Sequence, residues 1–168
     1  MRLVQAKKEQ ITRIMEIIED GRANLKQLGL PQWQNGYPDL EQMKKDVEQQ
    51  KSYVLMDGQK IIGTVCLDED GELAYDALNG KWSSNDPYIA IHRMAVAKEA
   101  AAKGIGKQFL QAIEEVVLAK GFKQIRLDTH TKNIPMQRVA KKNHYQYVGN
   151  VSYGENIPCY AYEKILTH

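Results

Sequence analysis

Two glycines at positions 104 and 106 stand immediately before a stretch with helical periodicity, and this arrangement could bind an anion. The loop reads Ala101-Ala102-Lys103-Gly104-Ile105-Gly106 and is followed by Lys107. Small side chains leave the backbone accessible, and the first amides of a helix point outward with the positive end of the helix dipole behind them. The two lysines add positive charge. The pattern predicts a phosphate site, although two glycines alone equally suit a plain turn between a strand and a helix.

The spacing of this loop departs from two well-known nucleotide-binding patterns. A dinucleotide fingerprint needs a third glycine where Phe109 stands. A P-loop needs glycine at Ala101 and serine or threonine at Gln108 to hold magnesium. The sequence therefore does not predict a nicotinamide cofactor, and phosphoryl transfer from ATP is not expected.

Size and composition favour one soluble domain spanning residues 1–168. The chain has 168 residues, is 43% hydrophobic, and carries 23 basic against 21 acidic side chains, a formal net charge of +2. So balanced a charge does not predict a nucleic-acid partner. We find no secretion signal and no apolar window of about 18 residues, so a cytoplasmic protein without a membrane partner is expected. Cys66 and Cys159 lack a second ligand at metal spacing, so we expect buried thiols and no metal.

Hydrophobic periodicity predicts the elements that must hold the glycine loop. In the first half we expect a strand at 2–6, a helix at 11–28, and a short helix capped by Asp39, with Gln42 closing a capping box. A hairpin turn at Asp57-Gly58-Gln59 should join strands at 52–56 and 60–67. Residues 72–76 could form another strand or belong to the loop that carries Trp82. The second half predicts a strand at 88–96, a helix at 106–120, a strand at 123–129, a helix at 135–143, and strands at 145–151 and 158–165.

The second half of the chain strongly resembles the GNAT superfamily of N-acetyltransferases, and the helix, helix and hairpin order of the first half resembles it loosely. The family signature is a strand ending in an Arg-Leu-Ala-Val-like run, a loop of the form Gln/Arg-x-x-Gly-x-Gly/Ala, and a long helix. Here the run is Arg93-Met94-Ala95-Val96, and the glycine loop follows. The resemblance extends over Leu127-Asp128-Thr129-His130 and through the next helix to Asn143-His144-Tyr145. It implies an α+β fold in three α/β/α layers, with a mixed sheet of about six to seven strands and a splayed central pair.

The resemblance implies acetyl-CoA as cosubstrate. In this family, backbone amides of the loop hold the pyrophosphate, and the pantetheine arm pairs with a bulged strand, as an added strand would. Asn133 and Met136 would contact the arm as well, although Asn133 also reads as a plain cap of the helix that follows. The positions implied for the cofactor are Met94, Ala95, Val96, Ala102, Lys103, Gly104, Ile105, Gly106, Lys107, Asn133 and Met136.

Two positions depart from the family pattern. Ala101 stands where the loop usually begins with glutamine or arginine, which removes a side-chain contact to phosphate and puts affinity in doubt. Ala140 stands where many members carry a tyrosine that acts as an acid toward the departing thiol, so that role is not carried over. A thiol has a pKa of about 8.5, and its thiolate leaves readily without such help.

The catalytic base is expected to be His92, two residues before Met94. Imidazole titrates near pH 6.5, which suits removal of a proton from an amine. The amides of Met94 and Ala95 would bind the oxyanion. His92 reads equally well as a hydrogen-bonded histidine in the sheet, and Asp128 or His130 could act instead. Nearby, Tyr145 is expected in the core, and His144 as a helix cap with positive φ.

Aromatic residues in loops suggest where the acceptor binds. Trp33, Tyr37, Trp82 and Tyr88 could wall an amine pocket, or they could cover the sheet as an extension of the core. The expected function is acetyl transfer from acetyl-CoA to a primary amine of a small molecule, peptide or protein, in a ternary complex without a covalent intermediate. The alternative is a catalytically weak acyl-CoA-binding or sensing module. Many relatives pair, so a homodimer is compatible with the resemblance.

Overall fold

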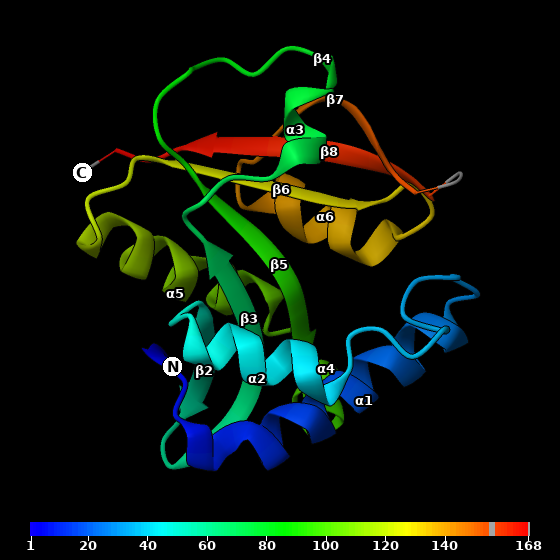
Figure 1. Cartoon of the computed structure of the whole chain (residues 1–168), viewed down its shortest axis with the longest axis vertical. Helices are drawn as coiled ribbons and strands as arrows, with labels where there is room; N and C mark the ends of the chain where they lie inside the picture. The colour runs from blue at the N-terminus through cyan, green and yellow to red at the C-terminus, as the bar shows by residue number, and fades with distance from the viewer. Residues whose placement is uncertain (155–156, 168) are drawn as a thin grey trace. The chain divides into compact units, whose positions relative to one another are not determined.

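The computed structural model describes residues 1–154 and 157–167 and divides the chain into two compact units (Figure 1). The first unit comprises residues 1–67 and 92–112, and the second comprises residues 68–91 and 113–168. Strand β5 (Ile89–Val96) and helix α5 (Gly106–Ala119) each contribute residues to both. The expectation of a single domain stays a prediction.

The strands pair in the order β1-β2-β3-β5-β6-β8-β7-β4, a mixed sheet that confirms the predicted α+β class. Strands β5 and β6 run parallel, whereas β1–β2, β2–β3, β6–β8, β7–β8 and β4–β7 are antiparallel. The remaining bounds are β1 (Arg2–Gln5), β2 (Ser52–Asp57), β3 (Lys60–Asp68), β4 (Asn79–Gly80), β6 (Gln124–His130), β7 (Gln146–Tyr153) and β8 (Ile157–Ile165). The described chain thus has eight strands rather than six to seven, because β4 adds an edge strand of two residues, which is too short to be predicted from hydrophobic periodicity.

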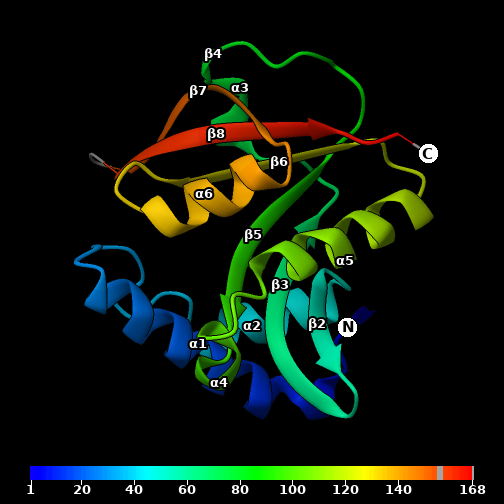
Figure 2. The ribbon, with the colours of Figure 1, turned by 180° about the vertical axis from the view of Figure 1, so that it is seen from behind.

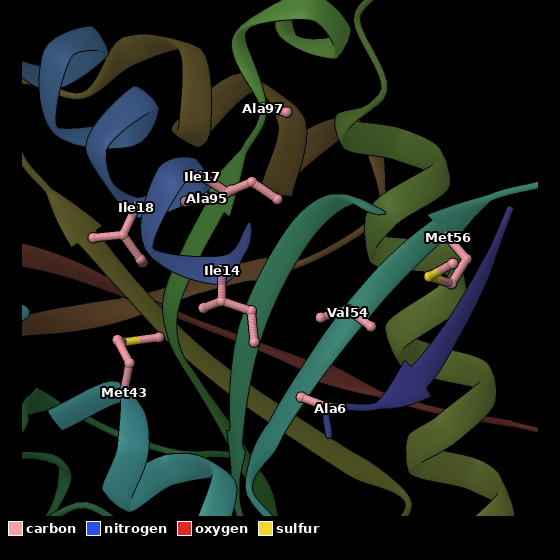
Figure 3. Packing of buried hydrophobic residues seen from close by; sticks show 9 residues of the cluster. All are labelled: Ala6, Ile14, Ile17, Ile18, Met43, Val54, Met56, Ala95 and Ala97. Atoms are coloured by element: carbon pink, nitrogen blue, oxygen red, sulfur yellow. The ribbon is translucent and has the colours of Figure 1, made fainter. Parts of the chain in front are cut away.

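In the first unit, α1 (Ile11–Gln27) and α2 (Leu40–Glu48) supply the side chains that cover one face of the strands (Figure 3). Ile14, Ile17 and Ile18 recur at helical spacing and are fully buried. Asp39 begins α2 as predicted, accepting a hydrogen bond from the Gln42 amide at 2.9 Å. The buried cluster consists of Ala6, Ile14, Ile17, Ile18, Met43, Val54, Met56, Ala95 and Ala97.

The opposite face of the hairpin packs against the start of α5. Gly63 pairs with Leu55 across β2 and β3, and the Phe109 ring lies against it. A Cβ built on Gly63 would stand 2.6 Å from Phe109 Cε2 and 3.2 Å from Leu55 Cβ. Because side chains alternate along a strand, Val54 and Met56 face α1 while Leu55 faces α5.

In the second unit, β6, β8, β7 and β4 carry α3 (Leu73–Asp76) on one side and α6 (Ile134–Lys142) on the other (Figures 1 and 2). Tyr75 of α3 is buried against a cluster on the α3 side of these strands. The other buried members of that cluster are Ala90, Val151, Cys159 and Ala161. The α3 side of these strands is thus covered largely by the segment between β3 and β5.

Some local predictions were wrong. Residues 72–76, expected either as a strand or as part of the loop that carries Trp82, contain a helical turn, and a short helix, α4 (Lys98–Ala101), precedes the glycine loop where no helix was expected. The Gln42 side chain donates to Asp46 at 2.9 Å instead of closing a capping box. The hairpin at Gly58 is confirmed, and His144 has the predicted positive φ, 66°. None of the helices described is long and apolar enough to cross a membrane.

Replacing Gly63 by alanine should destabilise the protein by about 1–3 kcal/mol, because the new methyl group would overlap the Phe109 ring. Urea unfolding measures the loss. A second substitution, Phe109→Leu, should recover part of it in the Gly63→Ala background by vacating that space. If Phe109→Leu lowers stability equally in both backgrounds, this packing account is contradicted.

Candidate functional site

Arg93 interrupts strand β5 with a left-handed backbone conformation. Its φ is +48°, whereas strand residues are normally extended. A residue with a side chain pays about 1–2 kcal/mol for this conformation, and such strain persists only when the surroundings hold it. A residue of this kind inside a strand bends the chain and redirects the neighbouring amides. It lies immediately before Met94 and Ala95, the predicted oxyanion donors.

A buried carboxylate holds the Arg93 side chain. Asp46 of α2 is only 1% exposed and binds the guanidinium at two points, Nε to Oδ2 at 2.7 Å and Nη2 to Oδ1 at 2.8 Å. Burial alone would lower the pKa of Arg93, but the hydrogen bonds and charges around it, chiefly Asp46, raise that pKa above its ordinary value. Arg93 therefore keeps its proton, and its contact with Asp46 joins α2 to the left-handed turn of β5.

The same guanidinium also contacts Tyr37 and Cys66. Arg93 Nη1 donates to the Tyr37 hydroxyl at 2.8 Å, and Nη2 lies 3.2 Å from the Cys66 sulfur. Arg22 of α1 holds the loop between α1 and α2. It donates hydrogen bonds to the carbonyl oxygens of Tyr37 at 2.8 Å and Pro38 at 2.9 Å, and also to that of Trp33. The loop between α1 and α2, with two predicted acceptor residues, is thus tied to Arg93.

Residues of the first unit that lie outside the glycine loop hold it in place. Asp20 of α1 accepts a hydrogen bond from the Lys98 amide at 2.9 Å, and the Ala97 amide donates to the Ile62 carbonyl at 2.9 Å. Ile105 is buried. These contacts fix both ends of the loop, and residues 101–104 between them are exposed.

Amides of the loop divide into two groups. Those of Lys103 and Gly104 donate within the turn, to Ala100 at 3.0 Å and Ala101 at 3.3 Å. The Phe109 amide donates to Ile105 at 2.9 Å and closes the first turn of α5. An α-helix has no acceptor of its own for the four amides that precede this closure, here those of residues 105–108. These amides, rather than the whole of 102–107, are the ones suited to an anion.

The remaining predicted positions of the first unit lie along β5 and the loop. His92, Met94 and Val96 are half-buried, and Ala95 is buried. Ala102, Lys103 and Lys107 are exposed, and Gly106 is half-buried. Gly104 has a φ of +64°, and nothing lies within 4 Å of the place its Cβ would occupy. The loop therefore presents main chain to open space.

In the second unit, Asn133 caps helix α6. Its side-chain oxygen accepts from the Met136 amide at 3.2 Å, which confirms the capping interpretation. Both residues are half-buried. Ala140, at the position of the family's tyrosine, is completely buried. Contacts of Asn133 and Met136 with a cofactor stay predictions.

The two alternative bases are both engaged in this unit. Oδ2 of Asp128 accepts hydrogen bonds from the hydroxyls of Tyr75 and Tyr153, each at 2.7 Å. Burial, followed by the charge of Asp128, raises the pKa of both tyrosines, so their protons stay in place. Nδ1 of His130 accepts from the Lys132 amide at 3.1 Å. Each group thus has a structural partner.

Trp82 and Tyr88 hold a cation that belongs to the protein. The Arg126 guanidinium lies 4.1 Å from the Trp82 ring centre and 4.0 Å from that of Tyr88, and it donates to the Ser84 carbonyl at 2.8 Å. Trp82 Nε1 donates to the Tyr75 carbonyl at 2.9 Å. The structure thus places Trp33 and Tyr37 together in the first unit and Trp82 and Tyr88 together in the second. Their role toward an acceptor stays a prediction.

Sequence reasoning missed Asp46. One signal was available, because Asp46 follows the apolar Met43 by three residues and so falls on the same face of the predicted helix. A carboxylate on an apolar face requires a buried partner. Tyr145 is buried as expected, and its hydroxyl donates to Glu114 at 3.3 Å.

Comparison with known proteins decides the family. The model of the acetyltransferase (GNAT) family matches residues 11–145. The chain belongs to this family. No curated protein matches it. Membership supports an acyltransferase activity and confirms the resemblance seen in the sequence.

Solved structures of GNAT acetyltransferases share the fold. A GNAT acetyltransferase of Streptococcus agalactiae 2603 is 29% identical with a TM-score of 0.90, and the match covers 99% of this chain and 96% of that one. A Staphylococcus aureus Mu50 protein assigned as an acetyltransferase is 27% identical with a TM-score of 0.72, covering 98% and 99%. The aminoglycoside acetyltransferase AAC(6')-Ib, solved with coenzyme A, shares the fold at 16% identity and a TM-score of 0.70, covering 98% and 94%.

Stability of this GNAT protein should depend on the protonation of His130. Burial, and after it the charge of Lys132, lowers the pKa of this residue, which is 4% exposed. The unfolded imidazole, with a pKa of about 6.5, takes up a proton more readily than the folded one. The stabilisation is therefore complete above about pH 6.5 and is lost as the pH falls through the lowered folded pKa.

Urea unfolding at pH 7.5 and at pH 5 tests this expectation in the wild type and in His130→Gln, whose amide oxygen can still accept from the Lys132 amide. The wild type should lose more unfolding free energy between the two pH values than the variant does. Equal losses would show that His130 is not responsible.

Proposed function

We propose that the protein transfers an acetyl group from acetyl-CoA to a primary amine of a small molecule, peptide or protein, in a ternary complex without a covalent intermediate. The observation that carries the proposal is the first unit's combination of an open glycine loop at the start of α5 with a left-handed turn at Arg93. One feature suits a diphosphate and the other suits a thioester carbonyl. A cytoplasmic location and a homodimer remain predictions of the sequence.

Cofactor binding is assigned to main-chain nitrogens. The amides of residues 105–108 would face the pyrophosphate at the positive end of α5, with Lys103 and Lys107 as exposed counter-charges. Binding of the pyrophosphate by these main-chain amides needs no side chain at position 101. The replacement of the family's glutamine or arginine by Ala101 is therefore compatible with binding.

The main requirement that the reaction places on the protein is to position the two substrates. The neutral amine nitrogen attacks the thioester carbonyl carbon, the carbon–sulfur bond breaks, and CoA leaves as the thiolate of a thiol with a pKa of about 8.5, which takes up the second proton that the nitrogen releases. Amides of Met94 and Ala95 would stabilise the charge that develops on the carbonyl oxygen. Holding both substrates together supplies much of the acceleration. The amine must first lose a proton, and this step is assigned to His92.

A small cationic amine is the first acceptor class to examine. AAC(6')-Ib has been solved with ribostamycin and CoA and, separately, with paromomycin and acetyl-CoA. Those acceptors carry several amines, and the fold shared with this chain supports an amine panel that includes aminoglycosides, simple polyamines and peptide N-termini.

Thiol release from acetyl-CoA over this panel, measured beside CoA binding, tests the activity. Release that depends on the amine supports the transferase. Tight CoA binding without release by any amine would instead favour the weak acyl-CoA-binding or sensing module.

Gly104→Val should weaken CoA binding by about tenfold or more while leaving the protein folded. Valine is strained at φ +64° and would displace the loop backbone, yet its side chain would enter open space and clash with nothing in the protein. Titration calorimetry with CoA measures the change. Gly121→Val is a matched control, because Gly121 has a φ of +88°, open surroundings, and a place at the far end of α5. Equal affinity for both variants would contradict the assignment of the loop.

His92→Gln should lower kcat by roughly 100-fold or more at neutral pH, because a base would be lost that is matched to the pH of the reaction. It should also remove an acidic limb near pH 6–7 from the rate profile. Steady-state thiol release between pH 5.5 and 9 measures both effects. An unaltered profile would assign the proton to another group.

A further inference from the structure

We propose that Asp46 and Arg93 form a positioning pair, which holds the left-handed turn of β5 in the shape needed by the thioester and ties the loop of Tyr37 to it. The inference rests on the proposed function, because it explains how this chain presents the amides of Met94 and Ala95. Both residues lie in the first unit, together with the turn and the glycine loop.

The backbone at Arg93 needs an external restraint. A left-handed arginine within a strand is intrinsically unfavourable, and no glycine relieves it. The two parallel hydrogen bonds to Asp46, at 2.7 and 2.8 Å, fix the orientation of the guanidinium as well as its position. Whatever holds the end of this side chain restricts the φ of the residue that carries it.

Asp46 is itself held rigidly. It sits within α2, is 1% exposed, and accepts a further hydrogen bond from Gln42 of the preceding turn at 2.9 Å. A carboxylate buried in this way cannot turn toward water without leaving a charge unpaired. The restraint on Arg93 therefore begins in the helix, and the strand takes its shape from α2.

The third nitrogen of Arg93 extends this restraint to the loop between α1 and α2. Nη1 donates to the Tyr37 hydroxyl at 2.8 Å, and the Tyr37 side chain is 44% exposed. One guanidinium thus contacts a helix, a strand and an exposed aromatic residue. A Tyr37 without its hydroxyl keeps its ring but loses this connection.

The first experiment separates placement of the thioester from binding of the cofactor. Asp46→Asn keeps the shape of the side chain but removes its charge and one acceptor oxygen. We expect kcat for thiol release to fall roughly 10- to 100-fold, as misplacement of about 1 Å does elsewhere. The CoA dissociation constant should rise by much less than kcat falls, because the amides of residues 105–108, assigned to the pyrophosphate, do not depend on Arg93, whereas only the part of CoA that lies along β5 does. Arg93→Lys keeps the positive charge but loses the fork, and it should behave like Asp46→Asn.

Thr64→Val is the matched control for loss of a buried hydrogen bond in the same unit. Thr64 is completely buried in β3, and its hydroxyl donates to the Tyr53 carbonyl at 3.3 Å. This variant should unfold at lower temperature with kcat unchanged. If Asp46→Asn retains wild-type kcat, or if it loses CoA affinity in proportion to kcat, the pair is not a positioning device for the thioester.

Tyr37→Phe isolates the connection to the loop. It should raise KM for the amine by several-fold and leave CoA binding unchanged, since the pair with Asp46 remains. An unchanged KM for every amine that is turned over would remove Tyr37 from the proposal.

A second readout does not require activity. The Ala97 amide donates to the Ile62 carbonyl at 2.9 Å, immediately after the strand that Arg93 bends. Hydrogen exchange of a peptide covering residues 92–97 should accelerate about tenfold in Asp46→Asn, whereas a peptide covering residues 105–112 should keep its wild-type rate. Absence of thiol release from the wild type would reject the proposed function alone. Unchanged exchange at residues 92–97 would reject the pair.

Discussion

The buried ion pair between Asp46 and Arg93 is the interaction on which the first unit's candidate site depends. Burying two charges is unfavourable unless each is fully paired, and here the fork of hydrogen bonds, with Gln42 beside it, supplies the pairing. Such pairs add little to stability compared with apolar side chains of the same size. The pair between Asp46 and Arg93 instead determines local geometry, because it fixes Arg93 in a conformation that strand β5 alone would not adopt.

Much of the fold could be predicted because local signals agreed with one another. Ile14, Ile17 and Ile18 repeat at helical spacing, Gly58 marks the hairpin, and Gly121 follows the end of α5. The glycine loop could also be predicted from the sequence, because its expected anion binding depends on main-chain amides and on the absence of large side chains around them. His144 at positive φ belongs with these, because histidine tolerates that conformation.

The unpredicted features depend on contacts between distant residues. The helical turn containing Tyr75 is held by packing and by the Asp128 carboxylate, which is 53 residues away in the chain. The left-handed φ of Arg93 depends on Asp46, 47 residues away, and nothing in the local sequence of β5 requires it. Gln42 fits a capping box by spacing, yet its side chain turns to Asp46, since a buried carboxylate needs a donor more than an exposed helix end does.

Asp20 gives the glycine loop a foundation outside the loop itself. Its carboxylate holds the Lys98 amide at the start of α4, while Ile105 is anchored in the core at the other end. A surface loop whose shape is set at its two ends is free to change the side chains between them. Alanine at position 101 touches neither of these anchors, so the backbone path of the loop does not depend on the side chain at that position.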